Sequence, residues 1–197
     1  MIDGFKLFPG ALDAQAQAKL VDAVFAAAAE APLFRPVTPG GKPMSVQMTS
    51  LGERGWITDR TGYRYETTHP LTGRPWPPMP PALLDLWNRL SGAALSPDAC
   101  LVNLYRDGAK MGLHQDKDEA DFALPVMSIS LGDTALFRIG GTKRNDPTVS
   151  IRLTSGDVCV LGGAARLAFH GVDRIVQGSS RLVPGGGRIN LTLRRAA

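Results

Sequence analysis

The spacing of apolar residues divides the chain into helical and strand-like stretches. The first stretch has a helical period and is predicted to begin at Asp13, whose carboxylate suits a helix N-cap. It is predicted to end near Ala31, because Pro32 follows and cannot continue a helix. The apolar residues that share one face of this helix are Leu20, Val24, Ala27 and Ala31. Such a stripe favours packing on a sheet rather than a role in chemistry.

A second helix and a series of strands are predicted further along. The helix begins after Pro80-Pro81 and turns Leu83, Leu86, Trp87 and Leu90 inward. Beyond Asp98 the chain consists of short apolar or alternating runs separated by turn residues, which predict strands. These runs are Leu101–Arg106, Pro125–Leu131, Ala135–Ile139, Val149–Leu153, Asp157–Leu161 and Arg188–Arg194. Several short strands with this spacing are typical of a barrel or a double-sheet jelly roll.

The segment between the helices, about 34–80, has a different character. It is rich in Pro, Gly and Thr and contains Trp56, Tyr63, Tyr65 and Trp76. Flexible linkers lack such aromatic residues, so we expect strands and turns that form a lid. Residues 1–197 are therefore predicted to form one domain of the α+β class, mainly β with flanking helices. Its lid would span about 34–80 and its jelly-roll core about 98–197.

Composition limits the class of protein. With 197 residues, 44% hydrophobic and 20% charged, the chain is typical of a globular protein with a single core. A net charge of +4 permits a polyanionic partner such as nucleic acid without requiring one, because the basic residues are scattered. Cys100 and Cys159 lie in apolar runs and are expected to be buried and unpaired. We see no membrane span or leader sequence and expect a cytoplasmic location.

The sequence LHQDKDE holds two candidate metal ligands. His114 and Asp116 are two residues apart, so in extended chain both side chains leave the same face. His170 ends an apolar stretch, where we expect it to end a core strand, and it would complete a 2-His-1-carboxylate triad. Such a triad binds non-heme Fe(II) and leaves positions open for O₂ and a co-substrate. By itself an H-x-D triplet often arises by chance, and we expect His69 to lie outside the site.

The last predicted strand supports the interpretation of a metal site. One face of it carries Arg188, Asn190, Thr192 and Arg194, and the other face is apolar. Taken alone, this alternation is typical of an amphipathic strand whose polar face lies in water. A similar polar alternation places Asn103 and Tyr105 just upstream of the triad. Two guanidinium groups with such donors suit a dicarboxylate beside a metal, which indicates 2-oxoglutarate as co-substrate.

These motifs resemble the AlkB-type alkylation-repair dioxygenases of the Fe(II)/2-oxoglutarate superfamily. The resemblance extends from about residue 32 to the end of the chain, and its motifs occur in the same order. They include VTPGGKPMSVQMT (37–49), GWITDRTGYRYE (55–66), PDACLVNLYRDGAKMGLHQDKDE (97–119), FRIGGTKRNDP (137–147), RLAFHG (166–171) and RINLTLR (188–194). Two positions depart from the family pattern: Lys42 stands where an aromatic residue is common, and Leu161 replaces a tryptophan.

The resemblance implies a role for each matching residue. Fe(II) would be bound by His114, Asp116 and His170. The residues implied for 2-oxoglutarate, with either arginine on either carboxylate, are Asn103, Tyr105, Arg188, Asn190 and Arg194. Trp56 would stack on a damaged base opposite His114, and Asp118 would face the nitrogens of the lesion. The remaining residues implied to contact or approach the nucleotide are Tyr63, Tyr65, Arg144, Thr38 and Met48.

The implied reaction is oxidative demethylation of N-alkylated bases of the 1-methyladenine and 3-methylcytosine type. It would act on alkylated DNA, with RNA as a second candidate, and would couple decarboxylation of 2-oxoglutarate by O₂ to release of formaldehyde. We expect a monomer without a membrane partner. Two alternatives stay open: an Fe(II)/2-oxoglutarate hydroxylase of a protein or small molecule, and a catalytically silent module that binds nucleic acid.

Overall fold

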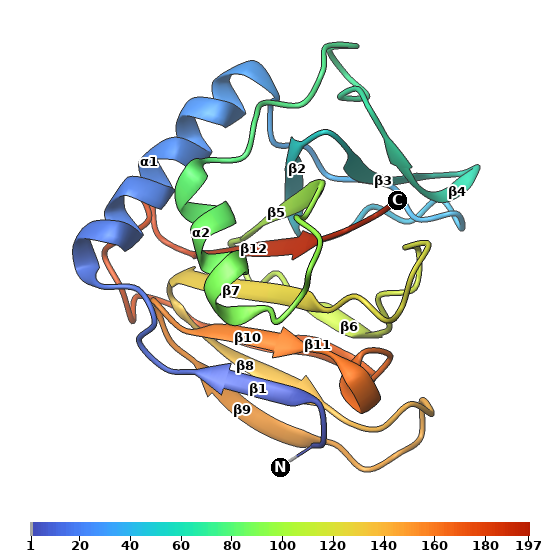
Figure 1. The fold of residues 1–197 in the computed structure, drawn as a ribbon. Helices are drawn as coiled ribbons and strands as arrows, with labels where there is room; N and C mark the ends of the chain where they lie inside the picture. Colours follow the sequence, from blue (N-terminus) through green and yellow to red (C-terminus); the bar gives the residue numbers. More distant parts are fainter. Residues whose placement is uncertain (1) are drawn as a thin grey trace.

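Two antiparallel sheets and one separate hairpin make up most of the fold (Figure 1). The computed structural model describes residues 2–197. The main sheet has the order β1-β10-β7-β12-β5-β2 and the smaller sheet has the order β6-β11-β8-β9. The main-sheet strands are β1 (Phe5–Phe8), β2 (Gln47–Gly52), β5 (Ala99–Tyr105), β7 (Val126–Gly132), β10 (Val158–Leu161) and β12 (Arg188–Arg194). Those of the smaller sheet are β6 (Met111–His114), β8 (Thr134–Ile139), β9 (Val149–Leu153) and β11 (His170–Val176).

The two sheets pack face to face. One cluster of buried residues takes members from both sheets, including Met48, Tyr105 and Leu161 of the main sheet and Phe137 and Val172 of the smaller one. The mainly β class with flanking helices is therefore confirmed, and two facing antiparallel sheets are consistent with a jelly-roll core.

Both predicted helices are confirmed and cover the outer face of the main sheet (Figure 1). Helix α1 (Ala14–Glu30) begins where the sequence indicated, because the carboxylate of Asp13 accepts a hydrogen bond from the Ala16 amide at 2.8 Å. Helix α2 (Pro81–Leu90) starts with a proline in its first turn. The helix residues buried against this face are Leu20, Val21, Val24, Leu83, Leu86 and Trp87. Neither helix is both long and apolar enough to cross a membrane.

The strand predictions for residues beyond 98 are confirmed within one or two residues for β5, β7, β8, β9, β10 and β12. Both cysteines are buried and unpaired, as expected. The prediction that His170 ends a strand is wrong, because it is the first residue of β11. The preceding residues form a short 3-10 helix, η1 (Gly163–Ala165), and a turn, so Ala165 and Ala168 are buried without being in a strand.

The segment predicted as a lid contains two structural parts. Strands β3 (Gly55–Asp59) and β4 (Gly62–Glu66) pair only with each other and form a separate hairpin. Strand β2, from the same segment, pairs with β5 at the edge of the main sheet, and its four central residues are buried. The separate part of the predicted lid is therefore the hairpin and its flanking loops.

Strand β12, the last predicted strand, has neither of its faces in water. It is paired on both edges, with β5 and with β7, and all of its residues are buried. Its apolar residues Ile189, Leu191 and Leu193 belong to the cluster that packs against the helices. The alternating polar residues therefore point to the opposite side, between the two sheets, and the interpretation of a solvated polar face is wrong.

Alanine at position 171 is expected to disrupt the pairing of β11 with β6. A Cβ at Gly171 would lie 2.6 Å from the carbonyl oxygen of Met111 and 2.9 Å from that of Gly112. Because these are backbone atoms, the strands must separate, and we expect Gly171→Ala to lower the free energy of unfolding by about 1–3 kcal/mol. Gly112→Ala is the matched control, since a Cβ there meets no atom within 4 Å. Equal Tm values for the two variants in thermal unfolding would contradict this prediction.

Candidate metal centre

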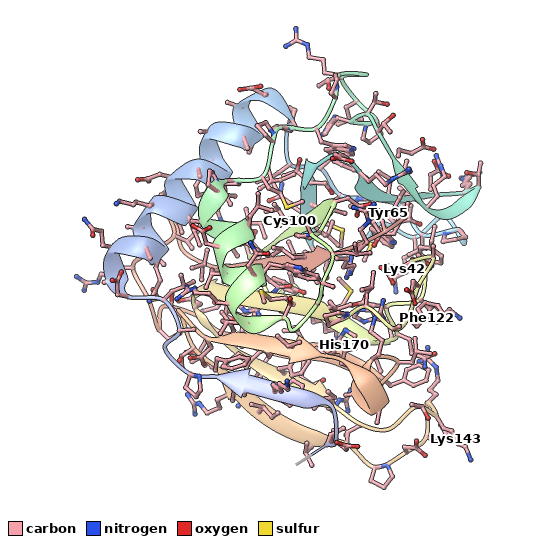
Figure 2. The ribbon with its side chains drawn as sticks, viewed as in Figure 1. Lys42, Tyr65, Cys100, Phe122, Lys143 and His170 are labelled. Carbon is pink, nitrogen blue, oxygen red and sulfur yellow. The ribbon has the colours of Figure 1, made fainter. Side chains whose placement is uncertain are left out.

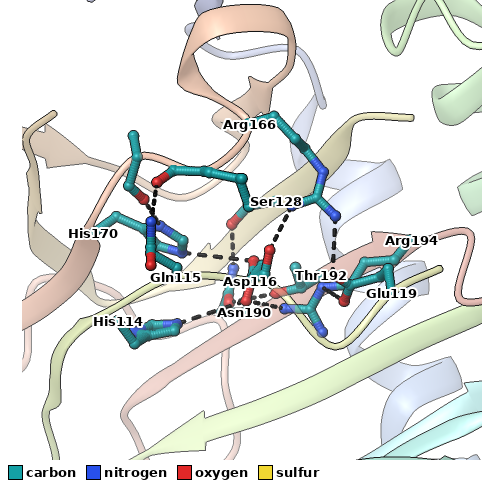
Figure 3. Close-up of polar contacts among 12 residues, drawn as sticks. His114, Gln115, Asp116, Glu119, Ser128, Arg166, His170, Asn190, Thr192 and Arg194 are labelled. Carbon is teal, nitrogen blue, oxygen red and sulfur yellow. Dashed lines mark hydrogen bonds and ion pairs between the residues drawn. The ribbon is translucent and has the colours of Figure 1, made fainter. Parts of the chain in front are cut away.

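Three side chains from two distant parts of the sequence converge between the sheets (Figure 3). His114 ends β6 and His170 begins β11, and the two are direct partners in the strand register. Asp116 lies two residues beyond β6, with its carboxylate 3.7 Å from Nε2 of His114 and 3.6 Å from Nε2 of His170. One potential ligand atom from each residue lies within 4.8 Å of the others. This arrangement suits a metal held on one face by three protein ligands.

Hydrogen bonds orient both imidazoles toward Asp116. Nδ1 of His114 lies 2.9 Å from the carbonyl oxygen of Gly112, and Nδ1 of His170 lies 2.9 Å from that of Ala168. These carbonyls fix Nδ1 as the protonated nitrogen and leave the Nε2 lone pair for a ligand. Burial lowers the pKa of His170 to about 4, which keeps this ring neutral at physiological pH.

The charge on Asp116 is stabilised by its surroundings. Burial would raise the pKa of this carboxyl, but the Arg194 guanidinium outweighs burial and holds the pKa well below its usual range. An ionised carboxylate is the form in which this side chain can bind a divalent cation.

A cavity of about 500 Å³ contains the triad and the polar face of β12. Both sheets and the hairpin line it. The predicted cofactor residues that line it are Asn103, Tyr105, Arg188, Asn190 and Arg194. A volume of this size accommodates a small organic acid together with part of a larger substrate.

The two arginines of β12 differ in their contacts. Arg188 is 1% exposed and donates one hydrogen bond, from Nη2 to Ser130 Oγ at 2.9 Å, while its guanidinium lies over the Tyr105 ring. Its Nε and Nη1 atoms have no hydrogen-bond partner among the described residues. Burial lowers the pKa of Arg188, since nothing nearby compensates its charge fully. A buried cation with two unsatisfied donors fits an anionic ligand such as a carboxylate.

Arg194 already has protein partners. Its Nη2 donates to Asp116 Oδ1 at 2.9 Å, and its Nε lies 3.4 Å from Glu119 Oε1. On the same strand, Asn190 Nδ2 donates to Ser128 Oγ, and on β5 the buried Oδ1 of Asn103 lacks a partner within residues 2–197. Among the described residues, the buried polar atoms of the cavity without a hydrogen-bond partner are thus Nε and Nη1 of Arg188, Oδ1 of Asn103 and Nε of Arg194.

The residues expected to contact a nucleotide divide into two groups. Those that line the cavity are Trp56, Tyr63, Asp118, Arg144 and Met48. Trp56 Nε1 donates to Asp118 Oδ2 at 2.7 Å, and its ring stacks on Tyr63 with centroids 5.7 Å apart. The Arg144 guanidinium lies over the Phe169 ring.

Thr38 and Tyr65 do not line the cavity. The hydroxyl of Thr38 accepts a hydrogen bond from the Lys42 amide within its own loop. The hydroxyl of Tyr65 is directed inward and donates to Glu119 at 2.5 Å. Of the two positions that depart from the family pattern, Leu161 lines the cavity, whereas Lys42 is exposed on its loop, as Figure 2 shows.

Sequence reasoning missed several residues around the triad. Glu119 is buried next to Arg194, and Arg166 is buried and donates to both Glu119 and the Asp116 carbonyl. The side-chain amide of Gln115, between the ligands His114 and Asp116, donates a hydrogen bond to the Leu167 carbonyl at 2.6 Å. Glu119 lies in the same LHQDKDE segment as the ligands, which could have singled it out. Arg166 likewise begins the RLAFHG motif that carries His170, but its contacts could not be predicted, because its partners are distant in the sequence.

His69 has a structural role away from this centre. It is fully buried between Phe34 and Trp76, and its Nε2 lies 2.9 Å from the Pro32 carbonyl. It therefore takes no part in the cluster of ligands, as expected from the sequence.

Comparisons with known proteins agree with this geometry. A sequence model of the 2OG-Fe(II) oxygenase superfamily matches residues 4–194. The chain is 67% identical over 196 residues to the alpha-ketoglutarate-dependent dioxygenase AlkB homolog of Caulobacter vibrioides, covering 100% of this chain and 89% of that protein. It is 47% identical over 173 residues to the alpha-ketoglutarate-dependent dioxygenase AlkB of Escherichia coli K12, covering 86% and 80%.

A solved structure shows the same fold. The structure of OsALKBH1 superposes with a TM-score of 0.82 at 33% identity, covering 98% of this chain and 96% of that one. The family match spans nearly the whole chain, and the similarity to the Caulobacter protein is equally extensive. This chain therefore belongs to the 2OG-Fe(II) oxygenase superfamily and, within it, to the AlkB-type dioxygenases that use Fe(II), 2-oxoglutarate and O₂.

Proposed function

We propose that this enzyme removes alkyl groups oxidatively from N-alkylated nucleic acid bases, such as 1-methyladenine and 3-methylcytosine, in DNA and in RNA. The observation that carries the proposal is the composition of one cavity. It contains the three candidate ligands, a buried arginine with free donors, and an aromatic ring paired with a carboxylate at Trp56 and Asp118. The relatives called AlkB support the same activity.

In this proposal, His114, Asp116 and His170 hold Fe(II). The donor set fits the ion, because the two Nε2 atoms and the carboxylate face one another. Fe(II) and 2-oxoglutarate, when bound, supply the oxidising chemistry with O₂. The surrounding side chains fix the direction of the ligands and exclude water from the cavity.

We assign the two arginines to different ends of 2-oxoglutarate. Arg188 binds the carboxylate remote from the metal, because its Nε and Nη1 atoms lack partners. Arg194 lies at the metal end, because it is paired with Asp116. Asn103 and Tyr105 line the same part of the cavity as Arg188 and would contribute polar contacts.

Trp56 and Asp118 form the proposed site for the base. Stacking on an aromatic ring contributes about 1–3 kcal/mol per base and tolerates any base identity. The hydrogen bond from Trp56 Nε1 fixes the ring and leaves the negative charge of Asp118 beside the cavity. Methylation at N1 of adenine or N3 of cytosine makes the base cationic and weakens its pairing. Extrusion of that base costs less, and Asp118 would favour it over the neutral base.

We further propose that the chain acts as a single domain and a monomer, with the β3–β4 hairpin as the lid over the base. Because Trp56 and Tyr63 lie on this hairpin, movement of the hairpin would open and close the site for the base.

The activity itself can be tested by release of formaldehyde. We expect the enzyme with Fe(II), 2-oxoglutarate and O₂ to release formaldehyde and succinate from oligonucleotides containing 1-methyladenine. Asp116→Ala is expected to abolish release, because the carboxylate ligand is lost. Asp121→Ala, in the same loop but exposed, is the matched control that keeps activity. Release from methylated peptides but from no oligonucleotide would favour the protein hydroxylase alternative instead.

The role of Arg188 can be tested by binding. Arg188→Met is expected to raise the Kd for 2-oxoglutarate by about 30-fold or more, because loss of one member of a buried charge pair costs about 2–5 kcal/mol. Isothermal titration calorimetry in the presence of Mn(II) measures this Kd. Arg138→Met is the control, since Arg138 pairs with Asp173 at the surface. A wild-type Kd for Arg188→Met would show that the carboxylate binds elsewhere.

The contact of Arg144 with phosphate can be tested by salt dependence. Binding of a methylated oligonucleotide, measured by fluorescence anisotropy, should weaken as salt rises. We expect Arg144→Ala to reduce the slope of log K against log salt by about 1, the value for one phosphate contact. Arg152→Ala on β9, an exposed residue outside the cavity, should keep the wild-type slope. Identical slopes for both variants would remove Arg144 from the interface.

A further inference from the structure

The hairpin is hydrogen-bonded to the segment that carries a metal ligand. Trp56 and Tyr65 are register partners in the β3–β4 hairpin, so their side chains leave the same face. Trp56 Nε1 donates to Asp118 Oδ2 at 2.7 Å, and the Tyr65 hydroxyl donates to Glu119 Oε1 at 2.5 Å. One cross-strand pair therefore binds two adjacent acidic residues that follow Asp116.

The contact made by Tyr65 is the buried one. Glu119 is 6% exposed, whereas Asp118 is exposed. The Tyr65 hydroxyl also accepts from Arg194 Nη1 at 3.4 Å, so it acts as donor and acceptor at once. Burial raises the pKa of Tyr65, which keeps the proton on this hydroxyl. Figure 2 shows the side chain of Tyr65 at the junction of the hairpin with the core.

Arg166 fixes the opposite side of the same segment. Its Nη2 donates to Glu119 Oε2 at 2.9 Å and its Nη1 to the Asp116 carbonyl at 2.6 Å (Figure 3). Its Nε donates to the Leu124 carbonyl at 2.7 Å. Glu119 is therefore bound through both oxygens, by Arg166 on one side and by the hairpin and Arg194 on the other. The segment 116–124 cannot shift without breaking these bonds.

Arg194 completes the connection to the candidate metal ligand. It lies between Glu119, at 3.4 Å, and Asp116, at 2.9 Å. Two carboxylates and two guanidinium groups thus form a buried set with balanced formal charge. In such a set the loss of one polar partner leaves the others incompletely compensated.

We propose that Tyr65 is a positioning residue that couples the docked hairpin to the orientation of Asp116, through Glu119 and Arg194. With the hairpin docked, the hydroxyl holds Glu119 and Arg194, and Arg194 holds Asp116 between the two imidazoles. With the hairpin displaced, Arg194 and Asp116 lose this restraint. A base stacked on Trp56 keeps the hairpin docked and so favours the geometry of the metal site. The inference rests on the proposed metal and base sites.

The test compares Tyr65→Phe with Tyr63→Phe. We expect Tyr65→Phe to weaken Mn(II) binding in the presence of 2-oxoglutarate by about tenfold, the lower end of what residues that orient metal ligands contribute. Isothermal titration calorimetry measures this affinity. Tyr63→Phe removes a hydroxyl two residues away that makes no hydrogen bond within the described chain, and it should bind Mn(II) like the wild type.

A second readout is the amount of 2-oxoglutarate consumed per formaldehyde released. This ratio should rise several-fold for Tyr65→Phe, because the metal site is no longer restrained by the docked hairpin. Glu119→Gln, with exposed Asp121→Asn as control, should show the same two effects. In the Tyr65→Phe/Glu119→Gln double variant the effects should be less than additive, because both changes interrupt one connection.

Two outcomes overturn the inference in distinguishable ways. If Tyr65→Phe has wild-type Mn(II) affinity and a wild-type ratio but a higher KM for the oligonucleotide, Tyr65 is a nucleotide contact and not a positioning residue. If the wild-type protein itself binds no Mn(II), the proposed metal site fails and the inference fails with it. Circular dichroism of each variant shows that the comparison is made between folded proteins.

Discussion

The central position of β12 determines what the space between the two sheets can contain. The strand is paired on both edges, so it cannot rotate or slip without breaking two ladders at once. Its polar side chains are therefore forced into the interior, where each unpaired donor or acceptor costs about 1–3 kcal/mol. Asn190 and Thr192 form hydrogen bonds within the protein, and Nη2 of Arg194 donates to Asp116. The space between the sheets therefore combines apolar residues with a charged site.

One face of the main sheet contributes mainly to stability, and the other carries the candidate site. The face toward α1 and α2 is covered by aliphatic side chains and Trp87, which form one continuous apolar cluster. The other face combines apolar residues with the arginines and the ligand cavity. Because the first face provides a large apolar core, the second can tolerate unsatisfied polar groups. The register pairing of His114 with His170 then relies on the smaller sheet, which supplies the remaining wall.

Local signals made much of the fold predictable. Asp13 and the Pro80-Pro81 pair mark helix starts through chemistry that acts within one turn, and the alternation in β12 identifies a strand with two distinct faces. Alternation alone cannot say which face meets water, since that depends on strands far away in the chain. Strand β6 was not predicted, because its four residues, MGLH, include a glycine and no β-branched residue. The start of β11 at His170 was not predicted, because the apolar residues before it are buried in a 3-10 helix and a turn and not in a strand.

The site was predictable only where its residues lie in compact motifs. The three ligands and the residues of β12 follow from LHQDKDE, RLAFHG and RINLTLR, and the structure brings them together. The resemblance assigned Tyr65 and Thr38 to the nucleotide, and in the structure their hydroxyls form hydrogen bonds within the protein, with Glu119 and with the Lys42 amide. Arg166 lies 50 residues from Asp116 along the chain, and its contact exists only through the tertiary fold. No local pattern encodes a contact of that kind.

Arg188 exposes a conflict between selection for folding and selection for activity. A buried guanidinium with unpaired donors lowers the stability of the folded protein. An apolar side chain of similar volume at this position would remove that cost. Evolution toward greater thermal resistance would therefore favour loss of this arginine, together with loss of co-substrate binding. A relative that no longer binds 2-oxoglutarate is therefore expected to carry an apolar residue at this position.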